Sequence, residues 1–200
     1  MRMAKFALAI VLAVAGLVLL ANQRVAANEG IPLKALAGNY SFTCQGTFAI
    51  CLDSTTFAPT NCGTGTPIVV PLTDLDVGAL TRDDQGNACA TGLGVDVSLP
   101  VGKNPPSVSP VHPAVAKTLN YDPATGTGDI SVSEYSGGKC IGSTFDSAGA
   151  KQTTNFVFHF AASNGGKRID MIVTSGTAFV TDTTGNFIGG FSLSCTNLRQ

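Results

Sequence analysis

The feature that most constrains the fold is a period-two alternation of apolar residues between positions 151 and 195. Every second residue from 156 to 160 is phenylalanine, and positions 169–173 repeat the spacing with other apolar side chains. Turn-forming residues interrupt the pattern at Asn164-Gly165-Gly166 and at residues 182–186. Alternation between Gly, Asn and Asp turns is typical of antiparallel strands with one covered face. The pattern therefore predicts strand, turn, strand, turn, strand.

The first residues have the features of a secretory signal peptide. Arg2 and Lys5 precede an unbroken apolar run at residues 6–20, and Val25-Ala26-Ala27 supplies small residues for cleavage. The alternative is an uncleaved membrane anchor, but 15 apolar residues fall short of the roughly 20 that span a bilayer. We expect residues 1–27 to be removed and residues 28–200 to form one β-barrel domain, secreted or periplasmic, with no membrane span after cleavage.

The balance of charge excludes some partners. The whole chain carries a net charge of −1, and the leader holds basic residues and no acids, so the exported part is acidic. Without a basic stripe, nucleic acid is a poor candidate partner. The expected partner is a small apolar molecule or another extracytoplasmic protein.

All six cysteines lie in the exported part of the chain. An even number of cysteines in an oxidising compartment predicts three structural disulfides, for which 15 connectivities exist. A metal site is the competing interpretation, but no Cys-x-x-Cys occurs and neither histidine neighbours a cysteine. We expect no metal and no cofactor. The cysteines are Cys44, Cys51, Cys62, Cys89, Cys140 and Cys195.

Further strands are expected upstream of this pattern. Residues 38–44 begin the first, residues 76–82 form the second, and a turn at 83–87 leads into a third that contains Leu93. Residues 117–121 and 128–135 form a hairpin. Five prolines among residues 100–113 exclude a central strand and predict an extended loop.

A recurring Asp-x-x-Gly element marks three of the turns, at Asp83, Asp146 and Asp182. The aspartate would cap the backbone of a type I turn, and the glycine would take the left-handed position that closes it. A calcium loop would stack several acids at alternate positions, so turn chemistry is the better interpretation.

About eight such strands in an all-β, antiparallel up-and-down meander would close into a barrel, since closure removes exposed edges. An open β-sandwich is the alternative. Closure would make the first and last strands neighbours, and a Cys44–Cys195 bridge would lock that seam. A Cys51–Cys62 bridge would staple one loop. The remaining pair, Cys89 and Cys140, fits less well, because a simple trace places the two at opposite ends of the barrel.

In its opening Gly38-Asn39-Tyr40, its turn at residues 83–87 and its turn Thr125-Gly126-Thr127-Gly128, the chain resembles lipocalin-like and avidin-like (calycin) barrels. It is also similar to exported bacterial barrel proteins of that shape. The resemblance implies a barrel fold. It does not carry a ligand across, because those families use tryptophans that this chain lacks.

No pattern of catalytic residues is present, so we expect a protein that is not an enzyme. His112 lies in the proline-rich loop, and His159 alternates with the phenylalanines and should face away from them. Neither neighbours a nucleophile motif. Asp74 and Asp76 share a strand face and could be paired carboxylates, although a solvated edge is the simpler explanation.

The aromatic side chains permit one functional hypothesis. Five phenylalanines would converge inside the barrel and either fill the core or line a site for a small apolar ligand. We expect ligand binding or protein interaction. A filled structural or surface interaction domain, and a cyclase- or isomerase-type enzyme acting in the lumen, are the alternatives. The five are Phe42, Phe156, Phe158, Phe160 and Phe191.

Overall fold

The computed structural model describes residues 30–98, 107–110, 112–178 and 188–200. The compact unit runs from Ile31 to Gln200, and the leader and its cleavage site lie outside the described residues. Two short 3₁₀ helices and eleven strands are assigned: η1 (Leu33–Leu36), β1 (Gly38–Leu52), β2 (Ile68–Arg82), β3 (Asn87–Ser98), β4 (Ser107–Pro110), β5 (Ala114–Asp122), β6 (Thr127–Ser136), β7 (Lys139–Ile141), β8 (Thr144–Asp146), β9 (Lys151–Ser163), η2 (Asn164–Gly166), β10 (Arg168–Ala178) and β11 (Ile188–Arg199).

Eight of these strands pair around a closed antiparallel ring. The order is β1-β2-β3-β5-β6-β9-β10-β11, and β11 pairs back with β1. Once β4 and the pair β7 and β8 are set aside, strands that are adjacent in the ring also follow one another along the chain. The predicted up-and-down meander and its closure are therefore confirmed. β4 extends the line of β5 along β3, and β7–β8 is a separate ribbon.

Several elements differ from the sequence-based expectation. β1 and β2 are each 15 residues long, and they pair with one another along their whole length. β4 lies within the expected proline-rich loop and pairs only with β3, which is consistent with proline at a sheet edge. The ribbon of β7 and β8 was not foreseen. The Asp182 turn lies outside the described residues.

The capped turns form as expected. Asp83 Oδ1 accepts hydrogen bonds from the backbone N–H groups of Gln85 and Asn87, at 3.0 and 2.8 Å. Gly86 has φ +83°, the left-handed conformation that glycine adopts without strain. Burial acts to raise the pKa of Asp83, but these bonds and those from the Asn87 and Ser143 side chains outweigh it, so the pKa is lowered.

One end of the barrel is packed shut, and we call it the closed half. Its core contains Tyr40, whose hydroxyl lies 2.9 Å from the carbonyl oxygen of Leu36 and 2.6 Å from that of Gly166. Tyr40 thereby connects η1, β1 and η2. The buried core residues are Leu36, Tyr40, Ile130, Phe158, Phe160, Ala162, Ile169, Met171 and Cys195.

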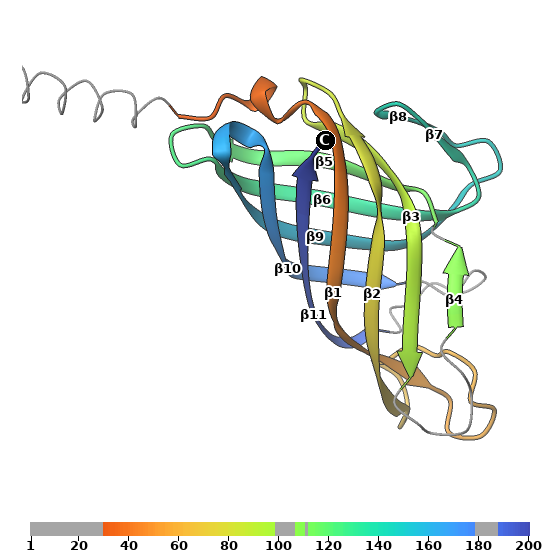
Figure 1. The fold of residues 1–200 in the computed structure, drawn as a ribbon. Coiled ribbons are helices and arrows are strands. Elements are labelled where there is room, and N and C mark those ends of the chain that lie inside the picture. The colour runs from red at the N-terminus through yellow and green to blue at the C-terminus, as the bar shows by residue number, and fades with distance from the viewer. Residues whose placement is uncertain (1–29, 99–106, 111, 179–187) are drawn as a thin grey trace, which may run out of the picture. The chain divides into compact units, whose positions relative to one another are not determined.

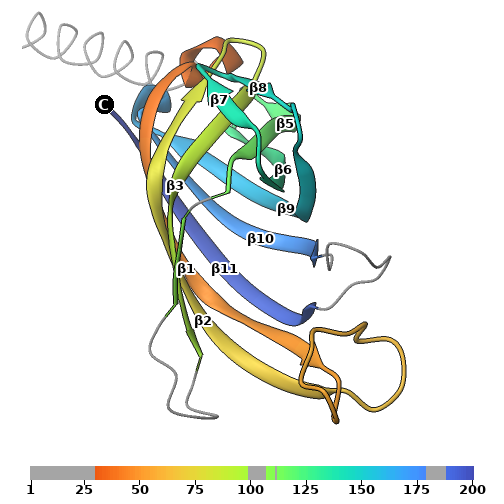
Figure 2. The same ribbon diagram turned by 90° about the vertical axis from the view of Figure 1, so that its right-hand side faces the viewer.

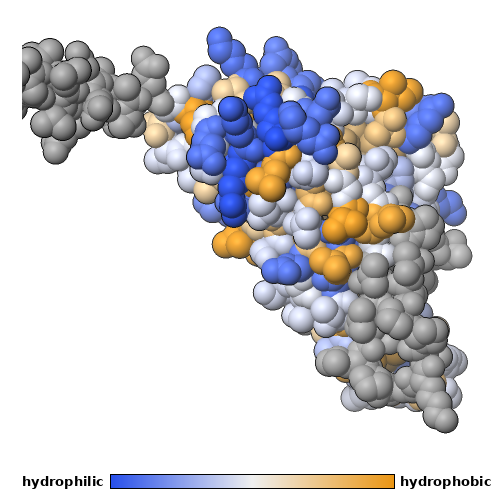
Figure 3. All heavy atoms as spheres, viewed as in Figure 1, coloured by the Kyte–Doolittle hydropathy of each residue, from blue (hydrophilic) through white to orange (hydrophobic). Residues whose placement is uncertain are grey.

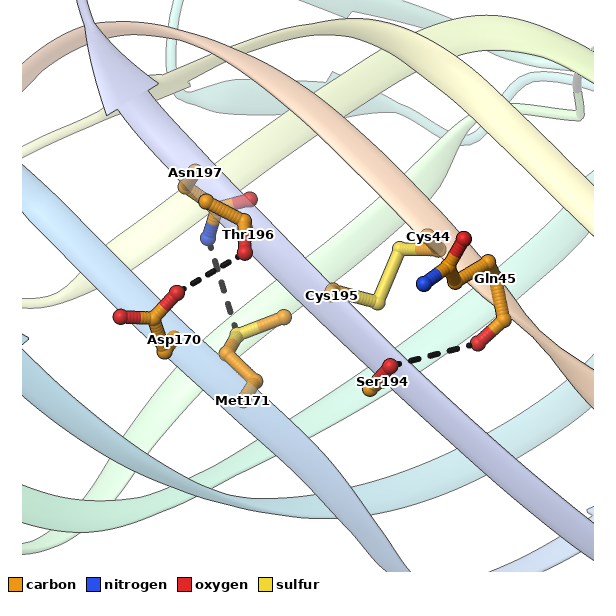
Figure 4. Close-up of a disulfide and its surroundings, with 8 residues drawn as sticks. All are labelled: Cys44, Gln45, Asp170, Met171, Ser194, Cys195, Thr196 and Asn197. Atoms are coloured by element: carbon orange, nitrogen blue, oxygen red, sulfur yellow. Dashed lines mark hydrogen bonds between the residues drawn. A yellow bond between two sulfur atoms is a disulfide. The ribbon is translucent and has the colours of Figure 1, made fainter.

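The seam between the first and last strands is locked by a disulfide. Cys44 and Cys195 stand directly opposite one another on β1 and β11, with their Cα atoms 4.0 Å apart. Figure 4 shows this bridge with the neighbouring bond from Thr196 Oγ1 to Asp170 Oδ1, at 2.8 Å, which joins β11 to β10. The expected bridge at this seam is therefore present.

The other two predicted disulfides are also present. Cys51 pairs with Cys62 across a loop, and Cys89 pairs with Cys140. A simple trace had placed Cys89 and Cys140 at opposite ends of the barrel. They can pair because Cys140 lies on the β7–β8 ribbon, which returns to the start of β3. The ribbon contacts β3, and Ser143 Oγ donates to Asp83 Oδ2 at 3.4 Å.

Beyond the closed half the ring divides into two sheets. β3 pairs with β5 only through Asn87–Ala90, and β10 pairs with β11 only as far as Ile172 and Ser194. A register shift follows in β10 between Val173 and Ser175, and such bulges bend a strand away from its neighbour. In Figures 1 and 2, β5, β6, β9 and β10 run in one direction and β1, β2, β3 and β11 in another. We call this part the open half.

Candidate functional site

The inner face of the barrel changes from buried to half-buried along seven of the eight ring strands. On β9, Phe160 and Phe158 are buried and Phe156 is half-buried; on β6, Ile130 is buried and Val132 is half-buried. On each of these strands the half-buried residues lie toward the part of the barrel where the two sheets diverge. The half-buried inner residues include Phe42, Phe48, Leu72, Asp74, Asp76, Val132, Glu134, Thr154, Phe156, Val173 and Leu193.

Between residues 74 and 77, β2 presents carboxylates to the inside of the barrel and apolar side chains to the outside, whereas Leu72 and Leu80 of the same strand face inward. The ring of Phe42 would meet a Cβ placed on Gly78 at 2.7 Å, so Gly78 faces the interior with Phe42. Alternation then places Asp76 and Asp74 on the same inner face. Leu75 and Val77 face outward and are 43% and 44% exposed.

This arrangement corrects the interpretation of Asp74 and Asp76 as residues of a solvated edge. Asp76 extends over Gly94 of β3, where an added Cβ would lie 2.6 Å from its Oδ1. The two carboxylates share one inner face, as their spacing indicated. Only the barrel shows that this face is the interior.

A third inner carboxylate comes from the other sheet. Glu134 of β6 stands opposite Thr154 of β9, and Thr154 Oγ1 donates to Glu134 Oε2 at 2.5 Å. Glu134 alternates along β6 with Ile130 and Val132, both of which are inner residues. The open half therefore has apolar walls with carboxylates contributed by both sheets.

The five candidate phenylalanines occupy two different environments. Phe158 and Phe160 are 3% and 1% exposed within the closed core, where their role is packing. Phe42 and Phe156 are half-buried at the start of the open half. The side chain of Phe191 lies outside the described residues. Of the candidate ligand-binding residues, Phe42 and Phe156 thus border the accessible inner face.

His159 lies on the outer face, away from the phenylalanines, as the alternation predicts. Its Nδ1 is 3.0 Å from Asp129 Oδ1, and Asn120 Nδ2 donates to Asp129 Oδ2 at 3.3 Å. The bond with His159, followed by that with Asn120, lowers the pKa of Asp129. His112 is exposed. Neither histidine belongs to the inner face.

Arg82 is a buried cation in the closed half and is not one of the residues singled out from the sequence. It is 2% exposed, and its Nη1 donates to Thr118 Oγ1 at 2.6 Å. Burial lowers the pKa of its guanidinium, while Tyr40 and Asp83 oppose that effect. Its Nε is buried without a hydrogen-bond partner. The packed core separates Arg82 from the open half, so we assign it to the structure of the closed half.

Within the described part of the chain, no group of three or more His, Cys, Asp or Glu side chains could hold a metal ion. In the same residues, no helix has the length and apolar character needed to cross a membrane. Comparison of the sequence with protein-family models and with curated proteins finds no match to either.

Proposed function

We propose that this protein is a non-enzymatic binding protein that holds a small, mainly apolar molecule in the open half of its barrel. The observation that carries the proposal is that inner residues change from buried to half-buried toward the open half on seven of the eight ring strands. Binding sites in barrels lie at their mouths and combine apolar walls with a few polar groups. Phe42, Phe48 and Phe156 would supply the walls.

The inner carboxylates suggest the polarity of the ligand. Asp74, Asp76 and Glu134 are hydrogen-bond acceptors when ionised, and they project among apolar side chains. A molecule with an apolar body and a hydrogen-bond-donating end, such as an amine, fits that combination better than an anion does.

The setting of this activity would be outside the cytoplasm. All six cysteines are paired, and disulfides persist in oxidising compartments. Together with the apolar run at residues 6–20, the disulfides support export by a signal peptide to the periplasm or the medium.

A calycin-like ancestry is part of the same proposal. It is supported by the eight-stranded up-and-down ring. The absence of tryptophan means that the residues used for a ligand would be this chain's own.

The first test is binding of a neutral apolar probe, N-phenyl-1-naphthylamine, to residues 28–200. We expect fluorescence enhancement with the wild-type protein and at least a roughly tenfold loss of affinity in Val132→Trp, which places a large ring on the half-buried inner face. Ile172→Trp, on the outer face, is the matched control. Probe binding that is absent, or equal in the two variants, contradicts the proposal.

The second test concerns the carboxylates. The double variant Asp74→Asn/Asp76→Asn should weaken binding of 1-naphthylmethylamine and leave 1-naphthalenemethanol unaffected, because only the amine is charged. Asp84→Asn, in an exposed turn, is the control. Native mass spectrometry of protein purified from its host would then show whether a retained molecule carries an amine.

A further inference from the structure

We infer that the tip of the β1–β2 hairpin docks on the surface of a neutral lipid bilayer and inserts the ring of Phe57 into it. We call this tip the finger and define it as residues 51–70, which comprise the end of β1, the loop after it and the start of β2. The Cys51–Cys62 bridge lies within the finger. Figures 1 and 2 show the finger at the lower end of the open half.

The finger extends past the ring of strands. β1 pairs with β11 as far as Ile50, and β2 pairs with β3 from Leu72 onward. Beyond these residues, in the described part of the chain, the pairing of β1 with β2 continues alone to Leu52 and Ile68. The hairpin therefore ends as a two-stranded ribbon, which can touch a flat surface without any movement of the barrel.

Large apolar side chains are exposed on the finger. Phe57 in the loop is 62% exposed, and Val69 and Ile68 on the ribbon are 55% and 38% exposed. Residues 54–73 include no Asp, Glu, Lys, Arg or His. On the face drawn in Figure 3, the strongly hydrophilic residues gather around the closed half, in the upper part of the view. The finger can thus enter an apolar phase without carrying a charged side chain with it.

The backbone of the loop holds Phe57 in its exposed position. Its φ is +57°, a left-handed conformation that is rare for a bulky residue. The Phe57 N–H donates to the carbonyl oxygen of Asp53 at 3.0 Å, and the Asp53 N–H donates to that of Ala58 at 2.8 Å. An unfavourable conformation that also leaves a phenylalanine in water has no benefit for packing. Strain of this kind is typical of functional sites.

The hydrogen bonds of the loop favour lipid as the partner. The N–H groups of Thr55 and Thr56 donate to Asp53 Oδ1 at 3.0 and 2.7 Å, and the Thr60 N–H donates to the carbonyl oxygen of Cys51 at 2.9 Å. Backbone groups that are bonded internally avoid the penalty that lipid imposes on unsatisfied ones. A strand or loop that recognises an extended peptide would instead leave such groups for its partner.

Exposed apolar residues on the barrel wall have a different setting. Ile172 and Leu198 are 58% and 48% exposed. Arg168 is the register partner of Leu198, and Asp170 precedes Ile172 by two residues on the same face of β10. Charged neighbours keep this surface in water, because a charged side chain is costly to move into lipid. Ile172 is therefore a control of nearly the same exposure as Phe57.

The position of the finger gives the contact a purpose, and this step rests on the proposed function. Phe48 and Leu72 are register partners at the base of the finger and belong to the half-buried inner face. Apolar molecules leave water for apolar surroundings, so a bilayer is a source of the proposed ligand. A finger docked on the bilayer would bring the open half close to that source.

The first experiment uses tryptophan as a reporter, since the chain contains none of its own. Phe57→Trp in residues 28–200 should show a blue-shifted emission when phosphatidylcholine vesicles are added. Phosphatidylcholine brominated in its acyl chains should quench that emission. Ile172→Trp should show neither effect.

The second experiment measures the strength of binding by co-sedimentation with the same vesicles. Phe57→Asn removes the ring and supplies a residue that tolerates positive φ. It should weaken vesicle binding about tenfold, the factor expected for the loss of a mostly exposed phenylalanine that becomes buried. Ile172→Asn should bind like the wild type. Val69→Thr, an exchange of similar shape, should weaken binding at least about twofold and repeats the test if Phe57→Asn fails to fold.

Three outcomes would overturn the inference. They are a wild-type protein that does not bind the vesicles, equal loss of binding in Phe57→Asn and Ile172→Asn, and an emission of Phe57→Trp that shifts in periplasmic extract but not with vesicles. The third would assign the finger to a protein partner.

Binding of N-phenyl-1-naphthylamine without vesicles separates this inference from the proposed function. Phe57→Asn should retain probe binding, because Phe57 lies outside the half-buried inner face. A wild-type protein that binds the probe but not the vesicles contradicts the docking alone, and one that binds the vesicles but not the probe contradicts the proposed function alone.

Discussion

Single side chains at the closed half hold distant parts of the chain together, and Tyr40 is the clearest example. Its hydroxyl lies between the carbonyl oxygens of Leu36 and Gly166, which are 130 residues apart in sequence. Burial raises the pKa of this hydroxyl, so it remains a donor at neutral pH. The residue that opens β1 therefore also fixes η1 and η2.

Replacement of Tyr40 by phenylalanine should lower the free energy of unfolding by about 1–3 kcal/mol, because it leaves buried carbonyl groups without their donor. Urea denaturation followed by circular dichroism measures the change. Tyr135→Phe is the control, since it removes the hydroxyl of a half-buried tyrosine whose ring packs against Phe145. Equal stability of the two variants would show that the Tyr40 hydroxyl contributes nothing.

At the scale of the element, β2 and β3 approach each other closely where both carry glycine. Gly78 and Gly92 are register partners, and the ring of Phe42 lies over both. A Cβ on Gly78 would lie 2.3 Å from the carbonyl oxygen of Thr91. The paired glycines thus let the two strands and the aromatic ring occupy one narrow layer.

Gly78→Ala should destabilise the protein by at least about 2 kcal/mol, because the added methyl meets backbone atoms that cannot rotate away. Thermal unfolding measures the loss. Gly63→Ala provides the control, as its Cβ would meet only a side-chain oxygen at 3.4 Å. A melting temperature of Gly78→Ala within a degree of that of Gly63→Ala would mean that β2 and β3 separate easily.

At the scale of the whole molecule, the disulfides differ in the length of chain they close. Cys44 and Cys195 are 151 residues apart, and Cys51 and Cys62 are 11 apart. A bridge stabilises a fold by restricting the unfolded chain, and the restriction grows with the loop it closes. The bridge across the barrel seam should therefore be the more stabilising.

Loop entropy gives about 5 kcal/mol for the Cys44–Cys195 bridge and about 3 kcal/mol for Cys51–Cys62. We expect Cys44→Ala/Cys195→Ala to lower the unfolding free energy by about 2 kcal/mol more than Cys51→Ala/Cys62→Ala does. Chemical denaturation of both variants, with the fully reduced wild type alongside, makes the comparison. The reverse order would indicate that the seam is held by strand pairing alone.

Much of this architecture could be predicted from the sequence, because the forces that produce it are local. Alternation located β9 and β10, and the aspartate-capped turn at Asp83 located the β2–β3 hairpin. The cysteine count and the expected closure indicated the pairing of Cys44 with Cys195. The full lengths of β1 and β2 were not predicted, because Gly46 interrupts the alternation that Phe48 and Ile50 continue, and pairing between the two strands carries both of them through.

Sequence alone determined which residues of each strand share a face, since a strand alternates with period two whatever surrounds it. It could not determine which face is the interior. Asp74 and Asp76 share a face whichever side of the sheet is covered. Only ring closure, with Phe42 packed over Gly78, turns that face inward. The tertiary structure thereby places carboxylates inside the barrel and leaves Leu75 and Val77 outside, because alternation is symmetric until a neighbouring strand covers one side.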